Sequence, residues 1–265
     1  MDTMKKISFA LICIGIFIPI GLTAQSGISM LEKEQLLISF LNIPDGEATL
    51  IQTEEGDNFL INTGSVYSTN DLVKQLKELH VKKINSIILT KHTDRYNGNI
   101  SYLMDKFQVE TVITSAKTEN LIPLIDDDKT KIWKKNEDYS LSNHLTFYVH
   151  DTSDQGEMTV TIEYGNNSIL YMGFSERSKV KSIVEHTMHK PDIIKIPDFA
   201  QGNSPSEKLL KALDPHISII FNVRSGKLNK SLIERLNESW IDVYQLKQVG
   251  TTIIQMTLHD YEIIS

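Results

Sequence analysis

The sequence predicts a mixed α/β fold, and three observations lead to this prediction. An apolar strand, Ile84–Leu89, is followed by a polar loop and by helical spacing over Ile100–Phe107. Short apolar strands joined by glycine turns open both halves of the chain, at Leu36 and at Leu145. The chain has 265 residues, enough for one large domain. We therefore expect one α/β domain behind a separate N-terminal segment.

The N-terminal segment, residues 1–27, has the layout of a signal peptide or an N-terminal membrane anchor. Lys5 and Lys6 precede an apolar run, Ile7–Leu22, and Ala24–Ser26 offers a small-x-small cleavage site. The run is short for a transmembrane helix, which favours the signal peptide. Either interpretation predicts that the domain at residues 28–265 is extracytoplasmic, secreted or anchored to the membrane.

Composition narrows the function classes. The net charge of −7 disfavours a nucleic-acid surface, which is usually basic. The single cysteine, Cys13, lies in the N-terminal apolar run, so the domain has neither a disulfide framework nor a cysteine-rich zinc site.

In the first half, apolar runs predict strands and helical spacing predicts helices. The strands are expected at Leu36–Leu41, Ala48–Thr53, Phe59–Ile61, Ile84–Leu89 and Val109–Ser115, and the helices at Asp71–Leu79, Ile100–Phe107 and Lys117–Ile125. Asn70 is the candidate N-cap of its helix. The acidic run Asp126–Asp128 lacks the ligand spacing and the glycine of a calcium loop, so we expect a solvated charge run.

The second half repeats the strand-rich opening and then alternates strands with helices. The strands are expected at Leu145–His150, Met158–Tyr164, Ser168–Met172, Asp192–Ile196, Ile217–Phe221, Val243–Leu246 and Thr251–Leu258. The helices are expected at Val180–Thr187, Ser206–Leu213 and Leu232–Glu238, with Ser206 or Ser204 as a cap for the second of them.

Several short motifs have the spacing of a known superfamily. They are Phe40-Leu41-Asn42-Ile43, Gly46-Glu47-Ala48, Ile61-Asn62-Thr63-Gly64 and the loop from Thr90 to Gly98. Together they resemble the metallo-β-lactamase superfamily, and in particular the metallo-β-lactamase domain of ComEC-type competence proteins. The resemblance runs from about Leu36 to Leu258 and implies a four-layer αββα sandwich.

The resemblance also implies where a metal site would lie. Its members bind one or two zinc ions through a His-x-His-x-Asp-His loop and further carboxylates and histidines, and the metal activates a water. This chain has other residues at the matching positions, namely Asn62, Lys91, Thr93, Arg95, Tyr96, Phe174, Asp198, Lys227 and Asn229. The metal-ligand motif is therefore degenerate. We expect no metal cofactor, and a non-catalytic pseudo-enzyme that binds a ligand through the former active-site cleft.

Two alternatives remain open at this point. Shifting the loop by one residue would give a rebuilt zinc or manganese site at His92, Asp94 and Asp198, as in a nuclease-like or phosphodiesterase-like hydrolase. Alternatively, Lys91, Arg95 and Lys227 would converge and bind a small anion such as phosphate. A nucleic-acid partner is disfavoured by the charge but kept open by the resemblance. Threading predicts that seven residues approach one another: Asn62, Lys91, Arg95, Tyr96, Phe174, Asp198 and Lys227.

Overall fold

The computed structural model describes residues 31–119, 121, 125, 127–175, 183 and 190–264. The predicted N-terminal segment, residues 1–27, lies outside the described residues, and so does most of the predicted helix Val180–Thr187. Of the predicted helix Lys117–Ile125, the structure describes residues 117–119, 121 and 125, and none of these five is helical, so the prediction is wrong for them. Among the described residues, no helix combines the length and the apolar character needed to cross a membrane.

The first half of the chain and its last two strands form an eight-stranded sheet in the order β15-β14-β1-β2-β3-β4-β5-β6. The strands are β1 (Leu36–Phe40), β2 (Thr49–Thr53), β3 (Asn58–Ile61), β4 (Ser86–Ile88), β5 (Thr111–Thr114), β6 (Thr130–Ile132), β14 (Thr252–Met256) and β15 (Tyr261–Ile263). Strands β3 to β6 are parallel, whereas the β15-β14-β1-β2-β3 part is antiparallel.

The second half forms a seven-stranded sheet in the order β13-β12-β11-β10-β9-β8-β7. The strands are β7 (Asp138–Ser142), β8 (Leu145–Thr152), β9 (Met158–Tyr164), β10 (Asn167–Tyr171), β11 (Ile193–Lys195), β12 (Ile217–Ile220) and β13 (Asp242–Gln245). Strands β10 to β13 are parallel, so their carboxyl ends lie at the same edge.

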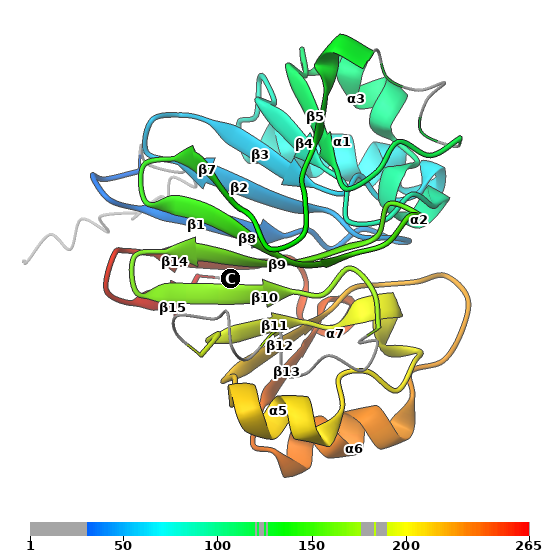
Figure 1. Cartoon of the computed structure of the whole chain (residues 1–265), viewed down its shortest axis with the longest axis vertical. Helices are drawn as coiled ribbons and strands as arrows, with labels where there is room; N and C mark the ends of the chain where they lie inside the picture. Colours follow the sequence, from blue (N-terminus) through cyan, green and yellow to red (C-terminus); the bar gives the residue numbers. More distant parts are fainter. Residues whose placement is uncertain are drawn as a thin grey trace, which may run out of the picture.

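Helices cover the outer face of each sheet, which gives the four αββα layers predicted from the sequence (Figure 1). On the first sheet lie α1 (Thr69–Glu78) and α3 (Ile100–Lys106), and on the second α5 (Glu207–Leu213) and α6 (Lys230–Glu238). The shorter helices are α2 (Asp94–Asn97), α7 (Leu246–Val249), η1 (Val66–Ser68), η3 (Asp127–Lys129) and η4 (Pro197–Ala200).

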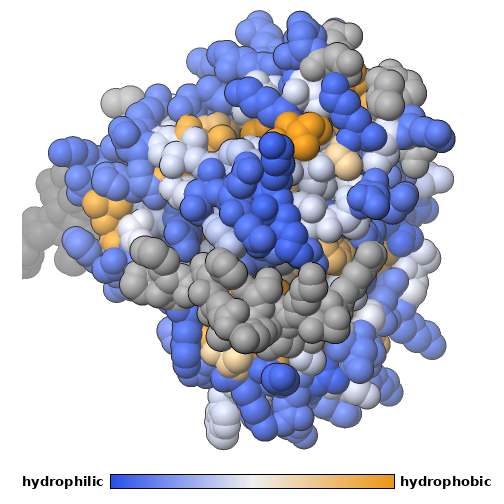
Figure 2. All heavy atoms as spheres, viewed as in Figure 1, coloured by the Kyte–Doolittle hydropathy of each residue, from blue (hydrophilic) through white to orange (hydrophobic). Residues whose placement is uncertain are grey.

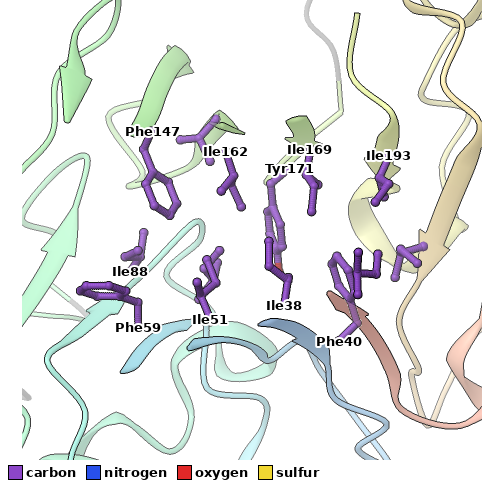
Figure 3. Close-up of a cluster of buried hydrophobic side chains, with 14 of the residues drawn as sticks. Ile38, Phe40, Ile51, Phe59, Ile88, Phe147, Ile162, Ile169, Tyr171 and Ile193 are labelled. Carbon is purple, nitrogen blue, oxygen red and sulfur yellow. The ribbon is translucent and has the colours of Figure 1, made fainter. Parts of the chain in front are cut away.

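The largest core lies between the two sheets (Figure 3). Ile38, Phe40 and Ile51 point from the first sheet toward Ile169 and Tyr171 of the second, and all five are fully buried. Because side chains alternate across a strand, the neighbours of these residues face the helices and build two outer cores. Burying each large apolar side chain contributes about 1.5–3 kcal/mol, so this core fixes the spacing of the sheets.

Most predicted elements are present, and the differences have local causes. Strands β6, β7 and β15 were not predicted, because all three are short, partly exposed edge strands that carry little apolar signal. The Asn70 cap was wrong: Asn70 lies inside α1, which Ser68 precedes. The Ser206 cap is confirmed, since its hydroxyl accepts a hydrogen bond from the Leu209 N–H. The face shown in Figure 2 is mainly hydrophilic, with isolated hydrophobic residues among the polar ones.

Candidate functional site

The candidate site lies where several parallel strands end. Asn62 follows β3, the loop from Thr90 to Gly98 follows β4, and η4 follows β11. These segments touch: the Asn62 N–H donates to the Ile88 carbonyl at 2.9 Å, and Lys91 reaches Asp198 of η4. Loops that follow parallel strands meet at the same edge of a sheet, and α/β proteins commonly bind ligands there.

The innermost feature is an ion pair between Lys195 of β11 and Glu47. The Lys195 Nζ lies 2.6 Å from Glu47 Oε2, and neither side chain has any exposed surface. Lys195 also donates to the Met172 carbonyl at 2.8 Å and lies 4.7 Å from the centroid of the Tyr171 ring. Removing two charges from water is expensive, so each is stable here only because the other is present and hydrogen-bonded.

Asn62 completes the surroundings of Glu47. Its amide nitrogen donates to Glu47 Oε2 at 3.3 Å and to Thr90 Oγ1 at 2.8 Å, while its carbonyl oxygen accepts from the Thr90 N–H at 2.9 Å. Burial raises the pKa of Glu47, and the Lys195 ammonium opposes this shift. Burial likewise lowers the pKa of Lys195, against the attraction of Glu47. The neutral amide of Asn62 adds hydrogen bonds to this pair without adding a further charge.

A second lysine holds the outer part of the site. Lys91 Nζ lies 2.9 Å from Asp198 Oδ1 and 3.2 Å from Glu157 Oε1, and its side chain is only 20% exposed. Burial alone would lower the pKa of Lys91, but the two carboxylates outweigh it and raise the pKa. Burial would raise the pKa of Asp198, yet the hydrogen bond and charge of Lys91 lower it on balance. Lys91 and Asp198 are therefore both charged at neutral pH.

Arg95 connects the two halves of the molecule at the rim of the site. Its Nε lies 3.3 Å from Asp45 Oδ1, and its Nη2 donates to Ser225 Oγ at 2.9 Å. Gln201, which follows η4, donates to the Ser225 carbonyl at 2.9 Å. The loop after β12 is thus bound to residues from both sheets. Next to it, the Arg224 guanidinium lies 4.5 Å from the ring centroid of the exposed Tyr67, and we call this pair the Tyr67–Arg224 surface.

The backbone of η4 is strained. Asp198, Phe199 and Ala200 have φ values of 49°, 55° and 55°, in the left-handed region. Each such residue costs about 1–2 kcal/mol when it is not glycine. Three contacts hold this turn: the Lys91–Asp198 ion pair, the Phe199 ring 5.6 Å from the Tyr96 ring, and the Ala200 carbonyl, which accepts from the Asn229 N–H at 2.8 Å. The strain is concentrated at the site, as is common for functional segments.

The alternative metal site at His92, Asp94 and Asp198 is not assembled. The His92 ring nitrogens bond to Thr118 at 2.8 Å and to Thr114 at 2.6 Å, and burial lowers the His92 pKa to about 4. Asp94 begins α2, and Asp198 pairs with Lys91. No group of three His, Cys, Asp or Glu side chains within the described residues could hold a metal ion.

The donor set around Glu47 does not fit zinc or manganese either. Two ammonium groups, those of Lys91 and Lys195, lie among the segments that would carry the ligands, and each contacts a carboxylate that a metal would need. An ammonium group has no lone pair to give and repels a divalent cation. The side chains present therefore do not fit the metal centre that the resemblance implies.

The predicted site residues divide into those that meet and those that do not. Lys91 contacts Asp198 and lies 5.6 Å from the Tyr96 ring centroid, while Asn62 lies beside Glu47. The Arg95 guanidinium lies 5.7 Å from the centroid of the Phe199 ring, which connects Arg95 to this group. The other predicted residues lie around it. Phe174 is buried after β10, Thr93 is an exposed residue before α2, Asn229 caps α6, and Lys227 is exposed in the loop after β12.

The alternative small-anion site requires Lys91, Arg95 and Lys227 to converge without acidic partners. Instead, Glu157 and Asp198 pair with Lys91, and Asp45 pairs with Arg95. Two of the three cations are neutralised by acids of the chain itself, which leaves no common anion site.

Sequence reasoning missed Lys195, Glu157 and Asp45. Lys195 did carry a signal, because it is the single charge inside the apolar strand Ile193–Ile196. A lysine at such a position requires a buried partner of opposite charge. Glu157 and Asp45 lie in polar loops, where an acidic residue is ordinary, so nothing local marked them.

Comparison with known proteins shows the fold. The metallo-β-lactamase fold protein YhfI from Bacillus subtilis is 11% identical, covering 84% of this chain and 100% of that one, with a TM-score of 0.63. Igni18, a metallo hydrolase from the hyperthermophilic archaeon Ignicoccus hospitalis, is 11% identical, covering 86% and 99%, with a TM-score of 0.56. CmlA, a diiron β-hydroxylase from Streptomyces venezuelae, is 10% identical, covering 88% of this chain and 54% of that one, with a TM-score of 0.58.

No protein-family model matches the chain, and no curated protein matches its sequence. The likeness is therefore one of structure at low sequence identity. The chain has a metallo-β-lactamase fold.

Proposed function

We propose that this chain is a non-catalytic, extracytoplasmic protein of metallo-β-lactamase fold that binds a ligand or partner at the site described above. The Lys195–Glu47 ion pair is the observation that carries the proposal. In this pair, the Lys195 ammonium puts a positive charge of the chain itself next to the loops that bind metal ions in the superfamily that the sequence resembles. The finer resemblance to ComEC-type domains supports the same idea, because it assigns the metal-binding segments to these loops.

The chemistry of the side chains supports a binding role. Hydrolysis in this fold would need a metal-activated water, and Glu47 Oε2, an oxygen that could bind a metal, already accepts from Lys195 and Asn62. Burial, with the nearby Glu47 and Asp198 carboxylates, raises the pKa of Tyr96 well above its usual range, which makes its hydroxyl a poor acid or base at neutral pH. His92 is neutral at that pH, but Thr114 and Thr118 hold it.

The accessible side of the site has the features of a binding surface. Tyr67 is 67% exposed and the neighbouring Val66 is 54% exposed, and Arg224 lies against the Tyr67 ring. Tyrosine and arginine are the residue types that most often dominate binding energy at interfaces. The contact between them reduces the conformational freedom that a partner would otherwise have to remove. We therefore assign ligand or partner contact to the Tyr67–Arg224 surface.

Metal analysis tests the proposal. The purified protein, prepared in medium containing zinc and manganese, is expected to carry well under one equivalent of either metal. Its melting temperature should not change when either metal is added, because the part of the chain that the structure describes holds no group of three ligand side chains for one. The same metal content and melting temperature are measured for Lys91→Ala and for Lys195→Met, each of which removes one of the two ammonium groups.

Stoichiometric zinc or manganese in the unmodified protein would overturn the proposal. If that metal were lost in His92→Ala, the result would favour the alternative, a metal-dependent hydrolase with a rebuilt site. The separation of His92, Asp94 and Asp198 gives that alternative no support from the geometry.

A further inference from the structure

Trp240 has an unusual backbone position. It follows the end of α6, where Ser239 is the C-cap, and its φ is 57°. The Trp240 N–H donates to the Asn237 carbonyl at 3.0 Å, and the Ile241 N–H donates to the Leu236 carbonyl at 3.2 Å. A helix that ends in this way usually has glycine at the left-handed position, because glycine has no Cβ to clash with the backbone. A tryptophan there is strained.

The same residue is also almost completely exposed. The Trp240 side chain is 94% exposed, whereas the other tryptophan, Trp133, is only 3% exposed. Tryptophan is the largest apolar side chain and is rarely left in water. Packing against the described residues therefore does not offset the backbone strain. Two separate disadvantages at one position indicate that the indole makes its contact outside the described part of the molecule.

The position of Trp240 in the fold suggests what that contact is. Contacts connect the start of β1 with the segment before β13. Met256 of β14 pairs with Leu36 on one side and with Tyr261 of β15 on the other. The Tyr261 hydroxyl lies 3.2 Å from His216 Nδ1, and the His216 carbonyl accepts from the Asp242 N–H at 2.9 Å. Trp240 therefore lies at the end where β1 begins, away from the candidate site. Figure 1 shows the start of β1 and the β14–β15 turn at this end, on the left.

We propose that Trp240 inserts into the interface of a lipid bilayer when the apolar run Ile7–Leu22 holds the chain at the membrane. Thirty residues precede the described part of the chain, and they join it at the end that carries Trp240. An indole suits this interface, because its ring is apolar and its N–H can reach the headgroups. The proposal uses the anchor interpretation of the N-terminal segment and is independent of the ligand. It orients the candidate site away from the bilayer.

The charged residues next to Trp240 in the sequence favour one kind of lipid. Glu238 and Asp242, the two charged residues within two positions of Trp240, are both acidic and exposed. A strongly anionic bilayer would repel them, so the expected partner is a zwitterionic surface such as phosphatidylcholine. Binding is expected to weaken as anionic lipid is added.

The experiment uses the full chain in phosphatidylcholine vesicles, with Trp133→Phe so that Trp240 is the only tryptophan. Relative to detergent micelles with the same chain, we expect the emission to shift to shorter wavelength and acrylamide quenching to fall by about twofold or more. Brominated lipid should quench the remaining emission. Trp240→Phe, which reports only on the buried Trp133, is the matched control and should show no quenching by brominated lipid.

Three outcomes of the lipid experiments would overturn the proposal. One is equal acrylamide quenching in vesicles and micelles. Another is failure of the full chain to float with the vesicles. The third is a blue shift that appears without lipid and grows with protein concentration, which would assign Trp240 to a contact with a second copy. Trp240→Gly keeps the test independent of folding: its melting temperature should equal or exceed that of the unmodified chain, and a fall would show that the indole serves the fold instead.

Discussion

Replacing Lys195 by methionine removes one charge from the buried Lys195–Glu47 pair while keeping most of the side-chain volume. The change leaves Glu47 buried beside Asn62 and Tyr171 with no ammonium partner. Breaking a buried pair in this way usually costs about 3–5 kcal/mol of the free energy of unfolding. For a domain of this size, such a loss corresponds to a fall of about 6–20 °C in melting temperature.

The double variant separates the ion pair from the packing. Glu47→Gln together with Lys195→Met removes both charges, so its loss of stability should be smaller than that of Lys195→Met alone. The single variant should also depend on pH. Without Lys195, burial holds the pKa of Glu47 above its unfolded value, so stability is highest below that unfolded value and is lost as the pH rises. Lys195→Met should therefore be less damaging at pH 5 than at pH 8.

Urea denaturation of the unmodified protein, Lys195→Met, Glu47→Gln and the double variant, at both pH values, measures these free energies of unfolding. Lys211→Met is the matched control. Lys211 pairs with Glu207 on the exposed face of α5, so its loss should change stability far less than the loss of Lys195. If Lys195→Met costs no more than Lys211→Met, or if the double variant is less stable than the single one, the buried pair does not hold the site as described.

Two further predictions concern His92. Its folded pKa of about 4 lies below the unfolded value of about 6.5, so its contribution to stability is complete above pH 6.5 and falls by up to about 3 kcal/mol as the pH drops toward 4. In His92→Gln, the free energy of unfolding measured in urea should therefore depend less on pH across this range. An unchanged pH dependence would contradict the lowered pKa of His92. Gly156 has a φ of 78° and a Cβ added there would meet the His92 ring, so Gly156→Ala should cost about 2 kcal/mol or more, whereas Gly56→Ala, with open space around it, should cost only the backbone strain.

The fold could be predicted because its signals are local and repeated. The alternating segment Met158–Tyr164 and the apolar run Ile217–Phe221 both indicate strands from the local sequence alone, and the turn glycines separate such strands. The edge strand β7 escaped because Asp138–Ser142 is polar and half exposed, and its pairing with β8 depends on a neighbour in space.

The candidate site was harder to predict because its charges are paired across long stretches of sequence. Lys91 and Asp198 are 107 residues apart, and Lys195 is far along the chain from Glu47. Threading placed Lys91 and Asp198 in neighbouring loops, but it could not tell a free cation from a neutralised one. That distinction depends on the positions of Glu157 and Asp45, which only the folded chain defines.

The Lys195 ammonium is part of the polypeptide, so the folded protein does not have to acquire this charge after synthesis. A bound ion must be acquired from the surroundings, and a chelator can take it away again. The charge on Lys195 is present in one copy from the moment the residue is translated, and it stays with Glu47 as long as the strands remain folded. The loops that meet at this pair therefore have a centre that does not depend on the supply of transition metals in the compartment where the protein works.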